Sequence, residues 1–221
     1  MKRLTHTLAI LLAAATLTVG AVAMAQDDST LDQASQDRAS SDQATKPVHP
    51  VTPEQLEQAK AREKVVLLLS GYHHFPSRAD LDAVAEAEPL MAVLRALAED
   101  EAVAPSMRLR AVDAMGLYDE SAATLYLIAR IAPVPESTPS EEARTLGLMR
   151  HRAMIALAKS RGVHSIEHLA PLLSDPDLQL RLTAISALGK HGGDSATKLL
   201  RALKERDTHH AIQREINKYV P

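Results

Sequence analysis

The chain has 221 residues, a formal net charge of −3, no cysteine and no tryptophan, and aromatic residues make up only 2% of it. This length allows one domain with a buried core. With so few aromatic residues, the core must be filled by Ala, Leu, Val, Ile and Met, which suit helix-on-helix packing better than a sheet. The missing cysteines exclude disulfides, thiolate metal sites, cysteine nucleophiles and a cysteine-linked lipid anchor. The absence of a basic excess argues against nucleic-acid binding, and we expect an all-α fold.

The N-terminus has the pattern of an export signal. Lys2 and Arg3 precede an apolar run from Leu8 to Ala23, and small residues surround the predicted cleavage point after Ala25. An uncleaved anchor is the alternative, because about 16 largely apolar residues barely suffice to span a bilayer. We expect residues 1–25 to be a cleaved signal peptide, which places the protein in the periplasm or outside the cell with no remaining membrane span.

The next segment, residues 26–51, is rich in Ser, Asp, Gln and Ala and ends in a proline-rich stretch. Such a composition buries too little apolar area to offset the entropy of ordering the backbone. We therefore expect a disordered acidic tether. It either spaces the folded domain from the cleavage point or binds a partner itself.

The folded domain is expected over residues 52–221, and its first helix has a clear start. Thr52 can cap the helix, Pro53 suits the first helical position, and Gln55 completes a capping box. The helical spacing of apolar residues continues to about Ser70, and Gly71 is expected to end the helix in the left-handed conformation.

A second helical stretch should begin at Ser77, and Pro89 permits only a break or a fresh start. We assign residues 52–88 to an N-terminal helical cap, residues 89–193 to a series of helix pairs, and residues 194–221 to C-terminal capping helices. The outer helix of each pair is expected at residues 90–99, 122–132 and 165–173.

Three segments share one pattern, in which an arginine is followed by alanine three and six residues later and by an apolar residue seven later. These Arg–Ala segments begin at Arg108, Arg150 and Arg181. Offsets of three, four and seven lie on one helix face, so each segment should be an inner helix that packs closely on its neighbours. The first interval is 11 residues longer than the second, and we expect the Pro/Ser/Glu-rich residues 133–143 to form an inserted loop.

The stretch from Leu169 to Gly189 resembles a HEAT repeat of the short, bilin-lyase-like type, and the resemblance covers roughly residues 90–220. It implies an α-solenoid in which an aspartate of the turn within a repeat bonds the inner-helix arginine. Asp175 or Asp177 would then serve Arg181. The residues of this structural ladder are Arg108, Arg150, Arg181, Asp175 and Asp177.

Offsets of two, five and nine from each arginine should form a stripe that faces away from the core. We expect this stripe to be a partner-binding surface for an acidic segment of another protein, although an ordinary solvated face is the alternative. Its candidate binding residues are Arg110, Asp113, Arg152, Lys159, Ser186 and Lys190.

No motif in the sequence points to catalysis or to a cofactor. The sequence contains no nucleophile elbow and no phosphate-binding glycine loop. His164 and His168 are four residues apart on an expected helix, a weak metal candidate because the pattern supplies no third ligand. We expect a non-catalytic protein-interaction scaffold of the cell envelope. The alternative is a regulatory or accessory subunit of an envelope enzyme, or a weakly metal-responsive module.

Overall fold

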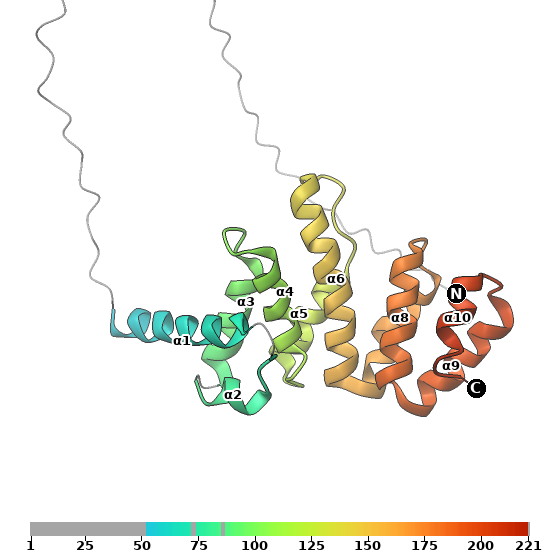
Figure 1. Ribbon diagram of the computed structural model, residues 1–221, viewed down its shortest axis with the longest axis horizontal. Coiled ribbons are helices and arrows are strands. Elements are labelled where there is room, and N and C mark those ends of the chain that lie inside the picture. Colours follow the sequence, from blue (N-terminus) through green and yellow to red (C-terminus); the bar gives the residue numbers. More distant parts are fainter. Residues whose placement is uncertain (1–51, 72–73, 85–86, 221) are drawn as a thin grey trace, which may run out of the picture. The chain divides into compact units, whose positions relative to one another are not determined.

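The computed structural model describes residues 52–71, 74–84 and 87–220, and the regular structure in these ranges consists of helices (Figure 1). The expectation of an all-α fold is confirmed for this part of the chain. The expected signal peptide at 1–25 and tether at 26–51 lie outside the described residues. Within the described ranges, no helix is both long and apolar enough to cross a bilayer.

The helices follow one another with short connections. In chain order they are α1 (Pro53–Ser70), α2 (Arg78–Asp82), α3 (Ala87–Glu99), α4 (Pro105–Met115), α5 (Ser121–Ile131), α6 (Ser140–Arg161), η1 (Gly162–Ser165), α7 (Ile166–Leu169), η2 (Ala170–Ser174), α8 (Leu178–His191), α9 (Gly193–Arg206) and α10 (His210–Ile216). The elements labelled η are short 3₁₀ helices.

Helix α1 begins as the sequence predicts. The Thr52 hydroxyl accepts a hydrogen bond from the Gln55 backbone N–H, and the Thr52 N–H donates to the Gln55 side chain. The expected left-handed ending is wrong, because Gly71 has a φ of −53° and an extended ψ of 117°. Its N–H bonds to the Leu68 carbonyl and its own carbonyl accepts from Arg110, so the chain leaves the helix without a left-handed residue.

Helix α3 begins only two residues before Pro89, as a fresh start after α2. A proline is tolerated in a first turn because the N–H that it lacks would have no intrahelical acceptor there.

The Arg–Ala segments form α4, the second half of α6, and α8. Helix α3 packs on α4, α4 on α6, α6 on α8, and α8 on α10, while α5 packs along α6. Figure 1 shows α6 and α8 side by side. Ala111, Ala153 and Ala184, at the third offset of each pattern, are fully buried in these contacts. The eighth offset is also small, and Gly116 lies so close to α6 that an added Cβ would be 2.8 Å from the Ala156 Cα.

Two expectations about the connections are wrong. The expected loop at residues 133–143 is shorter, because α6 already begins at Ser140. Glu141 and Glu142 lie in its first turn, where carboxylates interact favourably with the helix dipole. The outer helix expected at 165–173 is instead divided into η1, α7 and η2. Pro171 opens the last of these, since it has no N–H to continue an α-helix.

Candidate binding surfaces

Arg108 of α4 is a buried charge held by two neighbouring elements. Its side chain is only 4% exposed, and its Nε donates to the Ala98 carbonyl in the last turn of α3 at 2.9 Å. The two terminal nitrogens donate to the two oxygens of Glu142 at 2.8 Å each. This bidentate pair raises the pKa of Arg108 and lowers that of Glu142. Arg108 thus links α3, α4 and the start of α6.

The other two pattern arginines are held in a similar way. The Arg150 Nε donates to the Ile131 carbonyl at the end of α5 at 2.6 Å, and its Nη2 lies 3.4 Å from an Asp175 oxygen. The Arg181 Nη1 lies 3.3 Å from an Asp207 oxygen, while its buried Nε has no partner among the described residues. In all three segments, the carboxylate comes from a later part of the chain.

The expected pairing of Asp175 or Asp177 with Arg181 is therefore wrong. Asp177 caps α8, because its carboxylate accepts from the Gln179 N–H at 2.7 Å. Asp175 pairs backwards with Arg150 on α6, and its second oxygen accepts from the Asp177 N–H at 2.9 Å. Both carboxylates thus accept hydrogen bonds from groups other than Arg181.

Sequence reasoning missed the two remaining acids of this ladder, Glu142 and Asp207. The three carboxylates follow their arginines by 34, 25 and 26 residues. Glu142 and Asp175 thus lie shortly before the next pattern arginine, Arg150 and Arg181 respectively. A search for acids in the segment that precedes the next helix of the series would have included them.

The expected binding stripe begins with Arg110, whose side chain turns towards the N-terminal helices. Its Nη2 donates to the Gly71 carbonyl at 2.8 Å and to the His74 carbonyl at 3.3 Å. The guanidinium also lies 5.4 Å from the centre of the Phe75 ring. Arg110 is thus a structural contact that still contributes its positive charge to this face.

Further along the stripe, Arg152 of α6 bonds Asp113 of α4 at 3.2 Å. Burial raises the pKa of Asp113, against the opposing effect of the nearby charges, including those of Arg152 and Lys159. Burial also lowers the pKa of His191, and the charges of Lys190 and Lys159 act in the same direction. Lys159 therefore lies near enough to influence groups on both α4 and α8, and the cations of the stripe form one group.

The stripe also has less polar members. Ser186 of α8 shares a hydrogen bond of 3.1 Å with the Tyr219 hydroxyl, so its oxygen is engaged within the domain. Ile155, between Arg152 and Lys159 on α6, is 40% exposed and offers an apolar contact.

The histidine pair expected as a weak metal candidate is divided between two short elements. His164 lies exposed in η1, and His168 lies in α7 with its Nε2 3.2 Å from a Glu167 oxygen. In the part of the chain that the structure describes, no cluster of three or more potential ligands could hold a metal ion.

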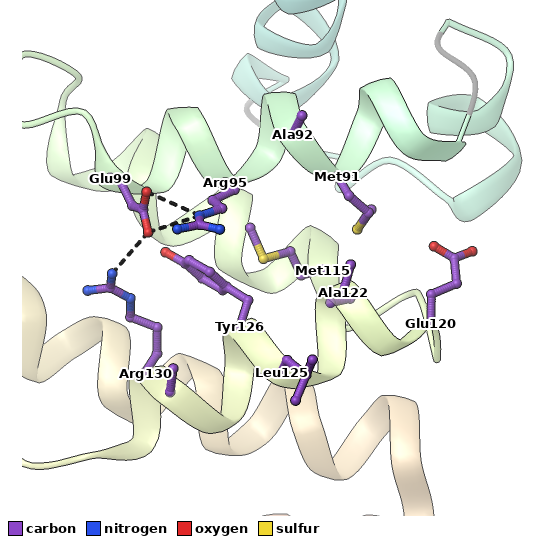
Figure 2. Close-up of a pocket in the computed structure, with 12 residues that line it drawn as sticks. Met91, Ala92, Arg95, Glu99, Met115, Glu120, Ala122, Leu125, Tyr126 and Arg130 are labelled. Carbon is purple, nitrogen blue, oxygen red and sulfur yellow. Dashed lines mark hydrogen bonds and ion pairs between the residues drawn. The ribbon is translucent and has the colours of Figure 1, made fainter.

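A second surface, which the sequence analysis did not anticipate, is a groove of about 830 Å³ between α3 and α5. Figure 2 shows Arg95, Glu99 and Arg130 gathered near one end of it and Glu120 at the other. Leu125, on its rim, is 67% exposed. The walls are formed largely by Met91, Ala92, Met115, Ala122, Leu125 and Ala129.

One sequence signal for this groove exists in α5. Ala123 and Leu127 are buried and form the face of α5 that packs against the core. Leu125 lies outside this face and is exposed. An apolar residue on the solvent side of a short amphipathic helix marks a candidate contact surface.

No family model, no curated protein and no solved structure matches this chain.

Proposed function

We propose that this chain is a non-catalytic binding module of the cell envelope. In this proposal, the face formed by α4, α6 and α8 holds an acidic segment of a protein partner. The helices are HEAT-like hairpins of an α-solenoid, and the export signal read from the N-terminus carries the module out of the cytoplasm.

The observation that carries the proposal is the charge of this face. Arg110, Arg152, Lys159 and Lys190 supply four cations, and Asp113 is the carboxylate between them. Three of the cations are exposed: Arg152, Lys159 and Lys190. An excess of one sign on one surface attracts segments of the opposite sign and speeds their association.

The magnitude of such interactions requires several contacts at once. An exposed ion pair contributes only about 0.2–1 kcal/mol, so one carboxylate would not hold a partner. An acidic segment that crosses α4, α6 and α8 can pair with Lys159 and Lys190 and share Arg152 with Asp113, while an apolar side chain covers Ile155. Such a segment gains affinity from the sum of these contacts and loses it with added salt.

The solenoid part of the proposal is supported by the equivalent use of the three pattern arginines. Each lies on an Arg–Ala helix and is paired with a carboxylate further along the chain. Nearest-neighbour links of this kind are typical of helical repeats, in which each unit contacts only the next.

The test is charge reversal on the exposed part of the face. The full chain with Arg152→Glu, Lys159→Glu and Lys190→Glu is compared with the wild type in crosslinking capture from an envelope extract. Partners of the wild type should be lost, and their capture by the wild type should weaken as salt is raised.

A matched control carries the same charge change elsewhere. Lys198, Arg201 and Arg206 are exposed on α9, and their replacement by Glu should leave capture unchanged. Equal capture by the two triple variants would reject the α4–α6–α8 face as the binding surface.

A further inference from the structure

Small side chains line much of the groove between α3 and α5. Ala92, Ala122 and Ala129 are exposed alanines along it, and Met91 and Leu125 add flexible apolar surface. Its volume of about 830 Å³ falls in the range typical of small-molecule sites, about 300–1,000 Å³, which are mostly apolar with a few convergent polar groups.

The polar groups of the groove converge at one end. The Arg95 Nε lies 3.3 Å from both oxygens of Glu99, and the Arg130 Nη2 lies 3.1 Å from one of them. Two guanidinium groups thus share one carboxylate, which leaves one positive charge at this end. The guanidinium N–H groups that these bonds do not use can donate to a second anion.

Tyr126 supplies the most specific feature of this end. Its side chain is packed below Arg130, whose guanidinium lies 5.2 Å from the ring centre, and the residue is only 9% exposed. Burial raises the pKa of its hydroxyl, and the neighbouring Arg130, which can only donate, acts against that rise. No group among the described residues accepts a hydrogen bond from this buried hydroxyl. Figure 2 shows it directed towards the space between Arg95, Glu99 and Arg130. Because an unpaired buried hydroxyl is costly, an acceptor placed there gains a strong bond.

The apolar lining of the groove favours one class of ligand over others. An extended peptide would lay its backbone N–H and C=O groups against Met91, Ala92, Ala122 and Leu125, where no partner for them exists. An alkyl chain has no polar groups to satisfy and is narrow enough to lie between the alanines.

We infer that this groove binds a medium-chain alkyl carboxylate, with its head group at Tyr126, Arg95 and Arg130. The carboxylate accepts a hydrogen bond from the Tyr126 hydroxyl and neutralises the excess guanidinium charge. The tail lies along Ala92 and Ala122 towards the other end of the groove. Glu120 at that end repels a carboxylate and thereby fixes the direction of the ligand.

The experiment is calorimetric titration of the full chain at pH 8 with decanoate, with decyltrimethylammonium as the probe of the same tail and opposite charge. Decanoate should bind, and the cation should bind at least tenfold more weakly. Absence of binding by decanoate, or equal binding of the two probes, would overturn the assignment.

Two variants test the head and the tail of the site. Tyr126→Phe removes a buried hydroxyl whose hydrogen has no acceptor, so thermal stability should change little while decanoate affinity falls about tenfold. Leu125→Gln should weaken decanoate through lost apolar contact, whereas Leu148→Gln, which changes another exposed leucine outside the groove, should not. An unchanged affinity in Tyr126→Phe would contradict the placement of the head group.

This site is independent of the face formed by α4, α6 and α8. The triple charge reversal on that face should leave decanoate binding unchanged, and Tyr126→Phe should leave partner capture unchanged. Failure of one assignment can therefore be told from failure of the other.

Discussion

The alanines of α4, α6 and α8 and the alanines of α3 and α5 have opposite structural consequences. Ala111, Ala153 and Ala184 are fully buried, because a neighbouring helix occupies the space above each of them. Ala122 and Ala129 are exposed and line an open groove. An alanine therefore permits close helix contact where another helix packs over it. Where no helix packs over it, the alanine leaves a groove.

The pattern arginines and the arginines of the groove also differ in their pairing. Arg108 is buried, Arg150 and Arg181 are partly buried, and each is paired with a carboxylate from a later part of the chain. In the groove, two arginines share one carboxylate and remain accessible to a ligand. The pattern arginines thus link successive helices, whereas the two groove arginines have N–H groups left for a ligand.

The largest effect is expected from breaking the most buried pair. Glu142→Ala leaves the Arg108 guanidinium buried without its bidentate partner, which should cost about 3–5 kcal/mol of unfolding free energy. The neighbouring Glu141→Ala is the matched control, because Glu141 is exposed in the same helical turn. Chemical denaturation should show a much larger loss of unfolding free energy for Glu142→Ala than for Glu141→Ala. Equal losses would contradict the dependence of Arg108 on Glu142.

A smaller loss is expected where α4 meets α6. Gly116→Ala places a Cβ 2.8 Å from the backbone of Ala156, so the helices must move apart, at a cost of about 1–3 kcal/mol. The control is Gly147→Ala on α6, where an added Cβ meets nothing within 4 Å, and that change should stabilise the helix by up to about 1 kcal/mol. Opposite shifts in melting temperature are the expected result, and shifts of the same sign would contradict the close contact.

The Arg181 pair should contribute less than the Arg108 pair. Its single ionic contact is 3.3 Å long and its side chain is 22% exposed. We expect Arg181→Ala to cost about 1–1.5 kcal/mol, or several degrees of melting temperature in a domain of this size. A change below about one degree would show that the pair contributes nothing to stability.

The smallest predicted effect is a pH dependence that begins as the pH falls through the ordinary histidine value of about 6.5. Burial lowers the pKa of both His151 and His191 below the ordinary value. As pH falls through the ordinary value, the unfolded chain takes up protons that the folded chain does not, so stability falls. The loss is complete once the pH is below the folded pKa values.

The pH prediction has its own control. A variant with His151→Gln and His191→Gln should lose most of this slope in denaturation experiments. Asp113 acts in the opposite direction at more acid pH, because its raised pKa favours the protonated folded state. Its contribution is the same in both proteins and cancels in the comparison. An identical slope in the variant would assign the dependence to other groups.

The sequence predicted the features that depend on neighbouring residues and on helix periodicity. The capping box at Thr52 and Gln55 is local chemistry, and the burial of Ala111 and Met115 follows from spacing along one helix. The partners of the arginines were not predicted, because Glu142 and Asp207 reach them through tertiary packing. The groove was missed for the same reason, since exposed alanines in α3 and α5 resemble the buried alanines elsewhere.

The direction of the arginine pairs has a consequence for how the domain can be shortened. Arg108 depends on α6, Arg150 on the turn before α8, and Arg181 on the turn before α10. A stop codon placed after α8 would strip Arg181 of its counter-ion, and each earlier truncation would expose the next arginine in the same way. Fraying of the C-terminal end should therefore loosen the remaining helices one after another, whereas removal of α1 leaves every one of these pairs in place.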